Sequence, residues 1–367
     1  MIRTEGMERT MEYRGKWIDG HLHIKDEPGL ELRELNEAME DIRRVSAMEA
    51  CAVQSIPAWD EDHVLQNPLA LLQKALYPDT TYFFGGLDYY VREPEAFGLQ
   101  VERLLKMGAD GFKLIETKPM VAKRIGLRSI ADAAYEPVFS LLEEKQVPVT
   151  WHVADPETFW DPALAPRWAM ESGWFYGDGT FPLKEDLYRD VETVLERHPK
   201  LSVTFAHLYF LAYDLERLDA FMARHPSVRV DLTPGCEMYG GFALRPGDWR
   251  QFFIRYQDRI LLGTDGGWLT GVAMEEKIGH AAGHAKRIRL FLSTEEELSF
   301  DEYRVRGLCL PEEVTRKILY ENFIRVTGEG PKRLNRGEIL DYFEMLEPRL
   351  KRGRDATRLR EIKERLP

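Results

Sequence analysis

Cysteine is scarce in this sequence. Cys51, Cys236 and Cys309 are the three cysteines of a chain of 367 residues, and they stand far apart. An odd number of widely spaced cysteines excludes a disulfide framework or a zinc knuckle and is typical of a reducing cytoplasm. The sequence also lacks any run of about 18 apolar residues, and residues 1–16 contain no apolar signal region. We therefore expect a cytoplasmic protein with no segment that crosses a membrane.

Positive charge is also in deficit. Lys and Arg number 50 against 62 Asp and Glu, so the formal net charge is −12. Such a chain is a poor partner for nucleic acid or for an anionic membrane surface. The hydrophobic fraction of 44% and the charged fraction of 31% are globular values, so a sizeable core can be buried. These numbers indicate a globular protein and count against both of those partners.

Strand-like and helix-like segments alternate along most of the chain. The predicted strands are residues 17–23, 50–55, 81–85, 111–115, 147–152, 201–206, 228–232 and 260–263. The predicted helices include residues 31–48, 93–107, 129–145, 184–197, 214–224 and 245–256, and residues 56–78 are left largely irregular. Strands such as VPVTW and LSVTFA are apolar throughout, as parallel strands buried on both faces are.

Eight such units predict a closed barrel rather than an open sheet, because most strands are joined by helices. The predicted fold is therefore a (β/α)₈ TIM barrel with additional C-terminal helices. We expect residues 1–16 to form an N-terminal extension and residues 17–330 to form the barrel. Residues 331–367 are expected to form a helical extension packed on or beside the barrel.

The first predicted strand carries two histidines. In WIDGHLHIKD, residues 17–26, the strand ends in His21 and His23. Side chains two residues apart on a strand point the same way, so the two imidazoles converge on one point. Spacing alone favours a simpler interpretation, two histidines in a polar loop, so the pair needs support from elsewhere in the chain.

That support comes from three other predicted strands, which end in His152, His207 and Asp265. Active sites of TIM barrels lie at the carboxyl ends of the strands, where all of these residues are expected to meet. Histidines with one carboxylate suit Zn²⁺ best, with Mn²⁺ or Fe²⁺ as alternatives. Asp265 could bind the metal and accept a proton as general base. His207 could bind the metal or polarise a substrate oxygen.

These motifs resemble the amidohydrolase superfamily, specifically its amidohydrolase-related branch of metal-dependent TIM-barrel hydrolases. The matching motifs are HLH, GADGFKLIE, PVTWH, HPKLSVTFAH, RILLGTD and LCLPEEVTRKILYENFIRV, within residues 17–326. The resemblance implies hydrolysis of a C–N or C–O bond, in an amide, lactone or ester, of a small polar, anionic substrate through a metal-activated water. The branch also includes decarboxylases, so a metal-dependent decarboxylase or hydratase of a small carboxylic acid stays open as the alternative.

The resemblance also assigns roles. The residues that match metal ligands are His21, His23, His152 and Asp265, and His207 matches the catalytic histidine. In members with two metals, a carboxylated lysine at the end of the fourth strand bridges them. Lys113 could be that lysine, but it lies within GFKLIE rather than clearly at its end. We therefore favour one metal, and a Lys113 that binds a substrate carboxylate or a nearby glutamate.

A long aromatic loop follows the fifth predicted strand. A loop of this length in a compact barrel, residues 155–182, is expected to be functional, and its many aromatic side chains argue against disorder. It is predicted to be a lid or pocket wall, or a contact surface of a homo-oligomer, which is the assembly that we expect. The predicted substrate-binding residues are Lys113, Trp160, Arg167 and Glu237.

Overall fold

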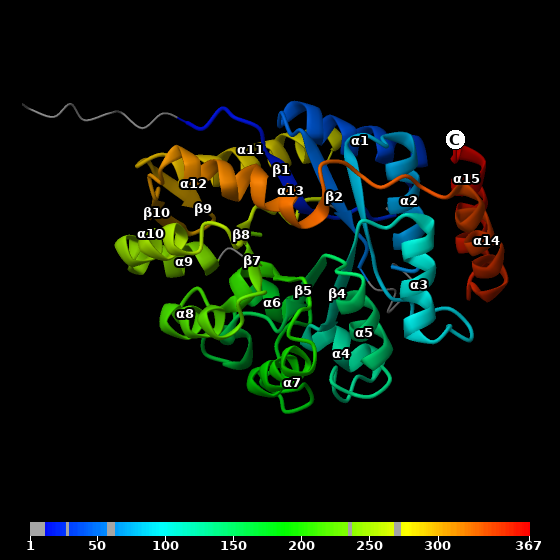
Figure 1. Cartoon of the computed structure of the whole chain (residues 1–367), viewed down its shortest axis with the longest axis horizontal. Helices are drawn as coiled ribbons and strands as arrows, with labels where there is room; N and C mark the ends of the chain where they lie inside the picture. The colour runs from blue at the N-terminus through cyan, green and yellow to red at the C-terminus, as the bar shows by residue number, and fades with distance from the viewer. Residues whose placement is uncertain (1–11, 27–28, 57–62, 234–236, 268–272) are drawn as a thin grey trace, which may run out of the picture.

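The computed structural model describes residues 12–26, 29–56, 63–233, 237–267 and 273–367, and the structural statements below concern that part of the chain (Figure 1). Cys236 lies outside it. Eight parallel strands pair in chain order, each with the next. They are β1 (Ile18–Leu22), β2 (Ala50–Gln54), β3 (Thr81–Gly85), β4 (Gly111–Thr117), β5 (Val149–Val153), β6 (Val203–Phe205), β7 (Arg229–Asp231) and β8 (Ile260–Leu261). The TIM barrel and its eight predicted strands are confirmed.

Helices and short helical turns follow the strands along the chain. They are α1 (Leu32–Val45), α2 (Gln66–Leu76), α3 (Phe97–Met107), α4 (Pro119–Ile125), α5 (Glu136–Glu144), η1 (Glu157–Trp160), α6 (Arg167–Glu171), α7 (Lys184–Arg197), η2 (Ala206–Phe210), α8 (Leu215–Arg224), α9 (Glu237–Leu244), α10 (Pro246–Arg255) and α11 (Met274–Ser293). A hairpin of β9 (Glu297–Phe300) and β10 (Tyr303–Arg306) follows, and then α12 (Glu312–Arg316), η3 (Lys317–Glu321), α13 (Asn322–Thr327), α14 (Arg336–Leu346), η4 (Glu347–Arg349) and α15 (Gly353–Arg365). Within the described residues, no helix combines the length and the apolar character needed to cross a bilayer.

Proline explains two errors in the predicted helices. The region taken as irregular contains α2, because Pro68 lies in the first helical turn, where its missing N–H is tolerated. The helix predicted from residue 129 begins only at Glu136, with Pro137 in its first turn. A third error is α9, whose Gly240 and Gly241 look like loop residues. Both glycines allow close approach, because a side chain at either would meet Tyr213 or Ala212.

The barrel closes where β1 meets the segment after β8. The Gly20 N–H donates to the Leu262 carbonyl at 3.0 Å, and the Asp265 N–H donates to the His21 carbonyl at 2.9 Å. We call this contact the β1–β8 seam. Strands β2 to β6 are buried along their whole length, so the core fills the barrel and the space under its helices.

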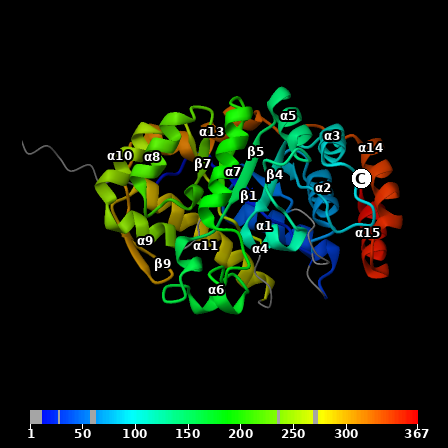
Figure 2. The same ribbon diagram turned by 90° about the horizontal axis from the view of Figure 1, so that it is seen from below.

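The last two helices pack against the barrel helices. Helix α14 lies beside α3, and α15 lies beside α2, as both views of the chain show (Figure 1 and Figure 2). The buried carboxylate of Asp110, just before β4, connects this extension to the barrel. It accepts hydrogen bonds from the Lys332 N–H at 2.7 Å, the Phe83 N–H at 2.7 Å and the Lys74 ammonium at 2.6 Å. Burial lowers the pKa of Lys74, and the charge of Asp110 opposes that shift.

We expect Asp110→Ala to destabilise the fold by about 3–5 kcal/mol, because it leaves the Lys74 ammonium buried without a counter-charge. Urea unfolding followed by circular dichroism measures the change. The control is Glu102→Ala, which removes an exposed ion pair with Lys106 on α3 and should cost less than about 1 kcal/mol. Equal effects of the two substitutions would contradict this account of the extension.

Candidate metal centre

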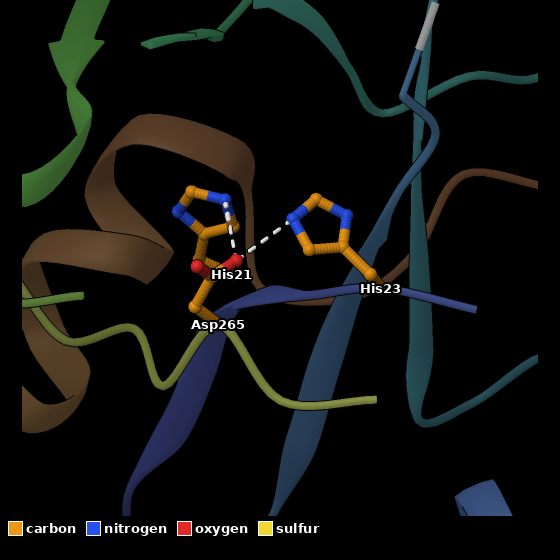
Figure 3. Close-up of side chains that lie close together, drawn as sticks. All are labelled: His21, His23 and Asp265. Atoms are coloured by element: carbon orange, nitrogen blue, oxygen red, sulfur yellow. Dashed lines mark ion pairs between the residues drawn. The ribbon is translucent and has the colours of Figure 1, made fainter. Parts of the chain in front are cut away.

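The β1–β8 seam brings three predicted ligands together. His21 and His23 come from the end of β1, and Asp265 comes from the segment after β8 (Figure 3). The Asp265 Oδ1 atom lies 3.0 Å from His23 Nε2 and 3.8 Å from His21 Nε2. One ligand atom from each residue lies within 4.8 Å of the other two. Such a group of two imidazoles and one carboxylate could hold a divalent ion.

Backbone geometry aims Asp265 at the histidines. Its φ angle of 55° is left-handed, a conformation that side-chain-bearing residues rarely adopt. Gly267 follows with a φ angle of 103°, and a side chain there would meet the His23 carbonyl. The turn at Gly266 and Gly267 lies directly against β1, because the His23 N–H donates to the Gly266 carbonyl at 3.0 Å.

Hydrogen bonds at the Nδ1 atoms fix the tautomers of His21 and His23. His21 Nδ1 lies 2.9 Å from Asp231 Oδ2, and His23 Nδ1 lies 2.8 Å from the Gln54 carbonyl. Because both partners only accept, each Nδ1 carries the hydrogen and each Nε2 keeps a lone pair. Burial and, to a smaller extent, the charge of Lys113 lower the pKa of His21 to about 3. The two Nε2 lone pairs are therefore available at neutral pH.

Asp231 is a site residue that the sequence interpretation missed. Besides binding His21, its Oδ1 atom accepts the backbone N–H of His207 at 2.9 Å. Burial raises its pKa, but the hydrogen bond and charge of His21 dominate and hold the pKa at about 2. The available signal was an aspartate inside a strand predicted to be fully buried. A lone charge there costs too much free energy unless it has partners.

Lys113 lies inside the same group. Its ammonium is fully buried and sits 2.7 Å from His21 Nε2, the atom whose lone pair points into the site. Burial lowers the pKa of Lys113 to about 8. The structure therefore holds a positive charge at the point that a metal ion on His21 would occupy. We expected Lys113 to contact substrate or glutamate; here its hydrogen-bond partner is His21.

His152 and His207 form a second pair beside this group. His152 Nε2 faces the Ala154 carbonyl at 3.0 Å, and His207 Nδ1 faces the Thr233 carbonyl at 3.0 Å. Both of these nitrogens must donate, so the remaining lone pairs, on His152 Nδ1 and His207 Nε2, face each other at 3.1 Å. Two facing lone pairs repel unless a cation lies beside them, and nitrogen ligands of a tetrahedral zinc ion stand about 3.3 Å apart.

His207 is held by a strained turn. His207, Leu208, Tyr209 and Phe210 all have left-handed φ angles between 51° and 59°. Such a conformation costs roughly 1–2 kcal/mol per residue, so packing must impose it. The hydrogen bond from the His207 N–H to Asp231 is one such restraint, and the ring of Phe210 stacks on the His207 ring with centroids 4.8 Å apart.

A buried carboxylate supports His152 from the side of the aromatic loop. Asp155 Oδ1 lies 3.4 Å from His152 Nε2 and 2.6 Å from Lys118 Nζ, and Asp155 Oδ2 accepts the Tyr176 hydroxyl at 2.6 Å. Burial would raise the pKa of Asp155, but the charges of Lys118 and His152 prevail and lower it. The loop is thus anchored beside the site through Tyr176.

The other predicted substrate-binding residues lie in different surroundings. The Trp160 indole donates to the Pro182 carbonyl at 3.2 Å, within the loop itself. The Arg167 side chain is 90% exposed and pairs with Glu171 on the same helix, so the structure places it on the surface. Glu237 is the first residue of α9, where burial and, to a smaller extent, the charge of Asp155 raise its pKa to about 7. Among the described residues, Trp160 and Arg167 make no hydrogen bond or ion pair to the histidines.

Comparison with known proteins agrees with this architecture. A family model described as amidohydrolase matches residues 18–326. A search of curated proteins found no significant match to the sequence. Among solved structures, an uncharacterized TIM-barrel protein from Bordetella bronchiseptica is 14% identical, with a TM-score of 0.54 over 85% of this chain and 98% of that chain.

Two further solved structures share the fold. The 4-oxalomesaconate hydratase of Rhodopseudomonas palustris is 12% identical, with a TM-score of 0.51 over 89% of this chain and 98% of its own. The IDCase of Metarhizium anisopliae is 14% identical, with a TM-score of 0.51 over 86% and 97%. The family match spans most of the chain and coincides with the barrel, so the protein belongs to the amidohydrolase family and is an enzyme.

Proposed function

We propose that this protein is a metal-dependent hydrolase that cleaves a C–N or C–O bond of a small polar, anionic substrate. The observation that carries the proposal is the convergence of His21, His23 and Asp265, which each offer one ligand atom within 4.8 Å of the other two. A divalent ion held there would supply a bound water of lowered pKa and would polarise the bond under attack.

The residues fit such an ion. Two imidazoles and a carboxylate are the donor set that zinc prefers, with manganese and iron as the alternatives. The Lys113 ammonium lies against the same Nε2 atom of His21, so an ion bound there would displace it. The facing lone pairs of His152 and His207 also need a cation, because burial lowers the pKa of each ring to about 4. His152 is the fourth ligand of our proposal.

Asp265 is the proposed general base. Its Oδ1 atom faces the histidines, which leaves Oδ2 to accept a proton from the attacking water. Burial would raise its pKa, but contact with the imidazoles of His23 and His21 holds it well below its usual range, so the group stays ionised. Its side chain is 32% exposed, and a substrate can therefore approach it.

The hydrogen bonds of His207 exclude one of the two roles that the sequence suggested, the polarisation of a substrate oxygen. Its Nδ1 hydrogen is used by the Thr233 carbonyl, so Nε2 is an acceptor. Polarising a substrate oxygen would require a second proton on this ring, which the pKa of about 4 opposes. We therefore assign His207 to proton acceptance or metal binding.

The alternative function is that of a lyase, a decarboxylase or hydratase of a small carboxylic acid that uses the same residues. This alternative is supported by the 4-oxalomesaconate hydratase of Rhodopseudomonas palustris, which shares the fold. Product analysis in ¹⁸O-labelled water separates the two. A hydrolase gives two cleavage products, one of which carries the label. A hydratase gives one labelled product with no bond cleaved, and a decarboxylase releases CO₂ without consuming water.

The first prediction concerns metal content. We expect about one divalent ion per chain, zinc before manganese or iron, measured by elemental analysis of protein prepared without chelator. Treatment with a chelator should abolish turnover, and the same ion should restore it. A reproducible content of two ions per chain would contradict the single-metal proposal and would point to Lys113 as a carboxylated bridging ligand.

The second prediction separates metal binding from chemistry at Asp265. Asn keeps one oxygen for the metal but cannot accept a proton, so Asp265→Asn should lower turnover by at least about 10²-fold while most of the metal stays bound. His21→Ala should lose metal and activity together. Near-normal turnover of the Asn variant would refute the assignment of Asp265 as base.

The third prediction concerns Asp231, which orients His21. Asp231→Asn replaces the charged acceptor of the His21 Nδ1 hydrogen, and we expect metal affinity to fall about 10–100-fold in a competition titration. Saturating metal should restore turnover, because Asp231 positions a ligand and does not contact substrate. Asp248→Asn, on the exposed face of α10, is the control and should change neither quantity. Unchanged affinity in the Asp231 variant would exclude the positioning role.

A further inference from the structure

A cavity of about 530 Å³ lies between α1, α11 and the segment after β8. Its wall includes Asp265, so the cavity adjoins the proposed metal centre directly. The two helices run along the same side of the barrel, next to β1 (Figure 1). The volume is that of a pocket for a small organic ligand, and such pockets have mainly apolar walls with a few polar groups.

The cavity exists because the two facing helices differ in side-chain size. On α1, the stripe Leu35, Met39 and Ile42 recurs at helical spacing and lines one wall. On α11, Gly279 and Gly283 line the opposite wall. A Cβ atom at Gly279 would meet nothing within 4 Å, and one at Gly283 would meet only the Arg287 Nη1 atom, at 3.8 Å. The space is therefore open on the α11 side and apolar on the α1 side.

The polar groups of the cavity lie on different parts of its wall. Asp265 comes from the β1–β8 seam, Arg287 comes from α11 about three turns beyond Lys277, and Asp301 comes from the turn between β9 and β10. The Arg287 guanidinium donates to His284 Nδ1 at 3.2 Å and lies over the Phe300 ring. Within the described residues it forms no ion pair with a carboxylate. A guanidinium beside an apolar wall suits a carboxylate or another planar anion.

We propose that this cavity binds the non-reacting part of the substrate, an alkyl or aryl body that ends in an anionic group bound by Arg287. The inference rests on the proposed function, because it places the bond to be cleaved at Asp265 and the rest of the molecule between α1 and α11. It also narrows the substrate class from small polar anions to amphipathic ones. A substrate that is polar throughout would make no favourable apolar contact with the wall of Leu35, Met39 and Ile42.

The test is a binding measurement that needs no turnover. The probe is 1-anilinonaphthalene-8-sulfonate, an apolar anion whose fluorescence rises in apolar surroundings, and octanoate, n-octanol and acetate are the competitors. We expect one probe molecule to bind per chain. Octanoate and n-octanol should displace it, and acetate should not, because acetate has no apolar body to fill the cavity.

Two variants test the two features of the cavity. Gly283→Leu fills the space with a residue of better helix propensity, so the helix should fold and affinity for octanoate and n-octanol should both fall at least about tenfold. Arg287→Gln should lower the affinity for octanoate at least about tenfold and leave the affinity for n-octanol unchanged. The matched controls are Gly247→Leu, at an exposed and open glycine of α10, and Lys286→Gln, an exposed cation next to Arg287. Both should bind like the wild type.

His21→Ala separates this inference from the proposed function. It removes a proposed metal ligand outside the cavity wall, so probe binding should persist although activity is lost. Absence of probe binding to the wild type, or wild-type binding by Gly283→Leu, would overturn the cavity proposal. Equal loss of octanoate and n-octanol binding in Arg287→Gln would overturn its anionic part. Normal cavity binding in a protein without hydrolase activity would refute the proposed reaction and leave the cavity assignment standing.

Discussion

The site depends on the closure of the barrel between β1 and the segment after β8. The hydrogen bond from the Asp265 N–H to the His21 carbonyl belongs both to the fold and to the site. A closed barrel has no free edge, so these backbone groups find partners only if the two segments meet in one register. That register fixes the distance between His23 and Asp265, and the candidate ligand group follows from it.

Closure of the barrel also buries several charged side chains away from water, and each of them has hydrogen-bonding or charged partners. Asp231 accepts from the ring of His21 and from the backbone of His207, so one carboxylate restrains both histidines. Asp155 does the same for His152 with the help of Lys118 and Tyr176. Buried carboxylates of this kind are costly when alone and effective when fully bonded, which favours a rigid, preorganised arrangement.

The wall beside the site is built on a different principle. Barrel helices normally bury an apolar stripe against a neighbour, and α1 presents such a stripe toward α11. The glycines of α11 leave a cavity beside that stripe, and the cavity extends to Asp265. The rigid ligand group at the β1–β8 seam can hold the reacting atoms in place. The apolar cavity next to it can determine which substrates bind.

The sequence by itself determined the fold and the strand ends, because buried parallel strands are apolar throughout and histidines stand out where they end. The convergence of His21, His23 and Asp265 was predicted in this way. Only the tertiary structure decided which nitrogen each histidine presents, because the partners, Asp231 among them, come from distant segments. Only the tertiary structure shows the contact of Lys113 with His21 and the cavity between α1 and α11. Both depend on the distances between packed strands and helices, which the sequence does not specify.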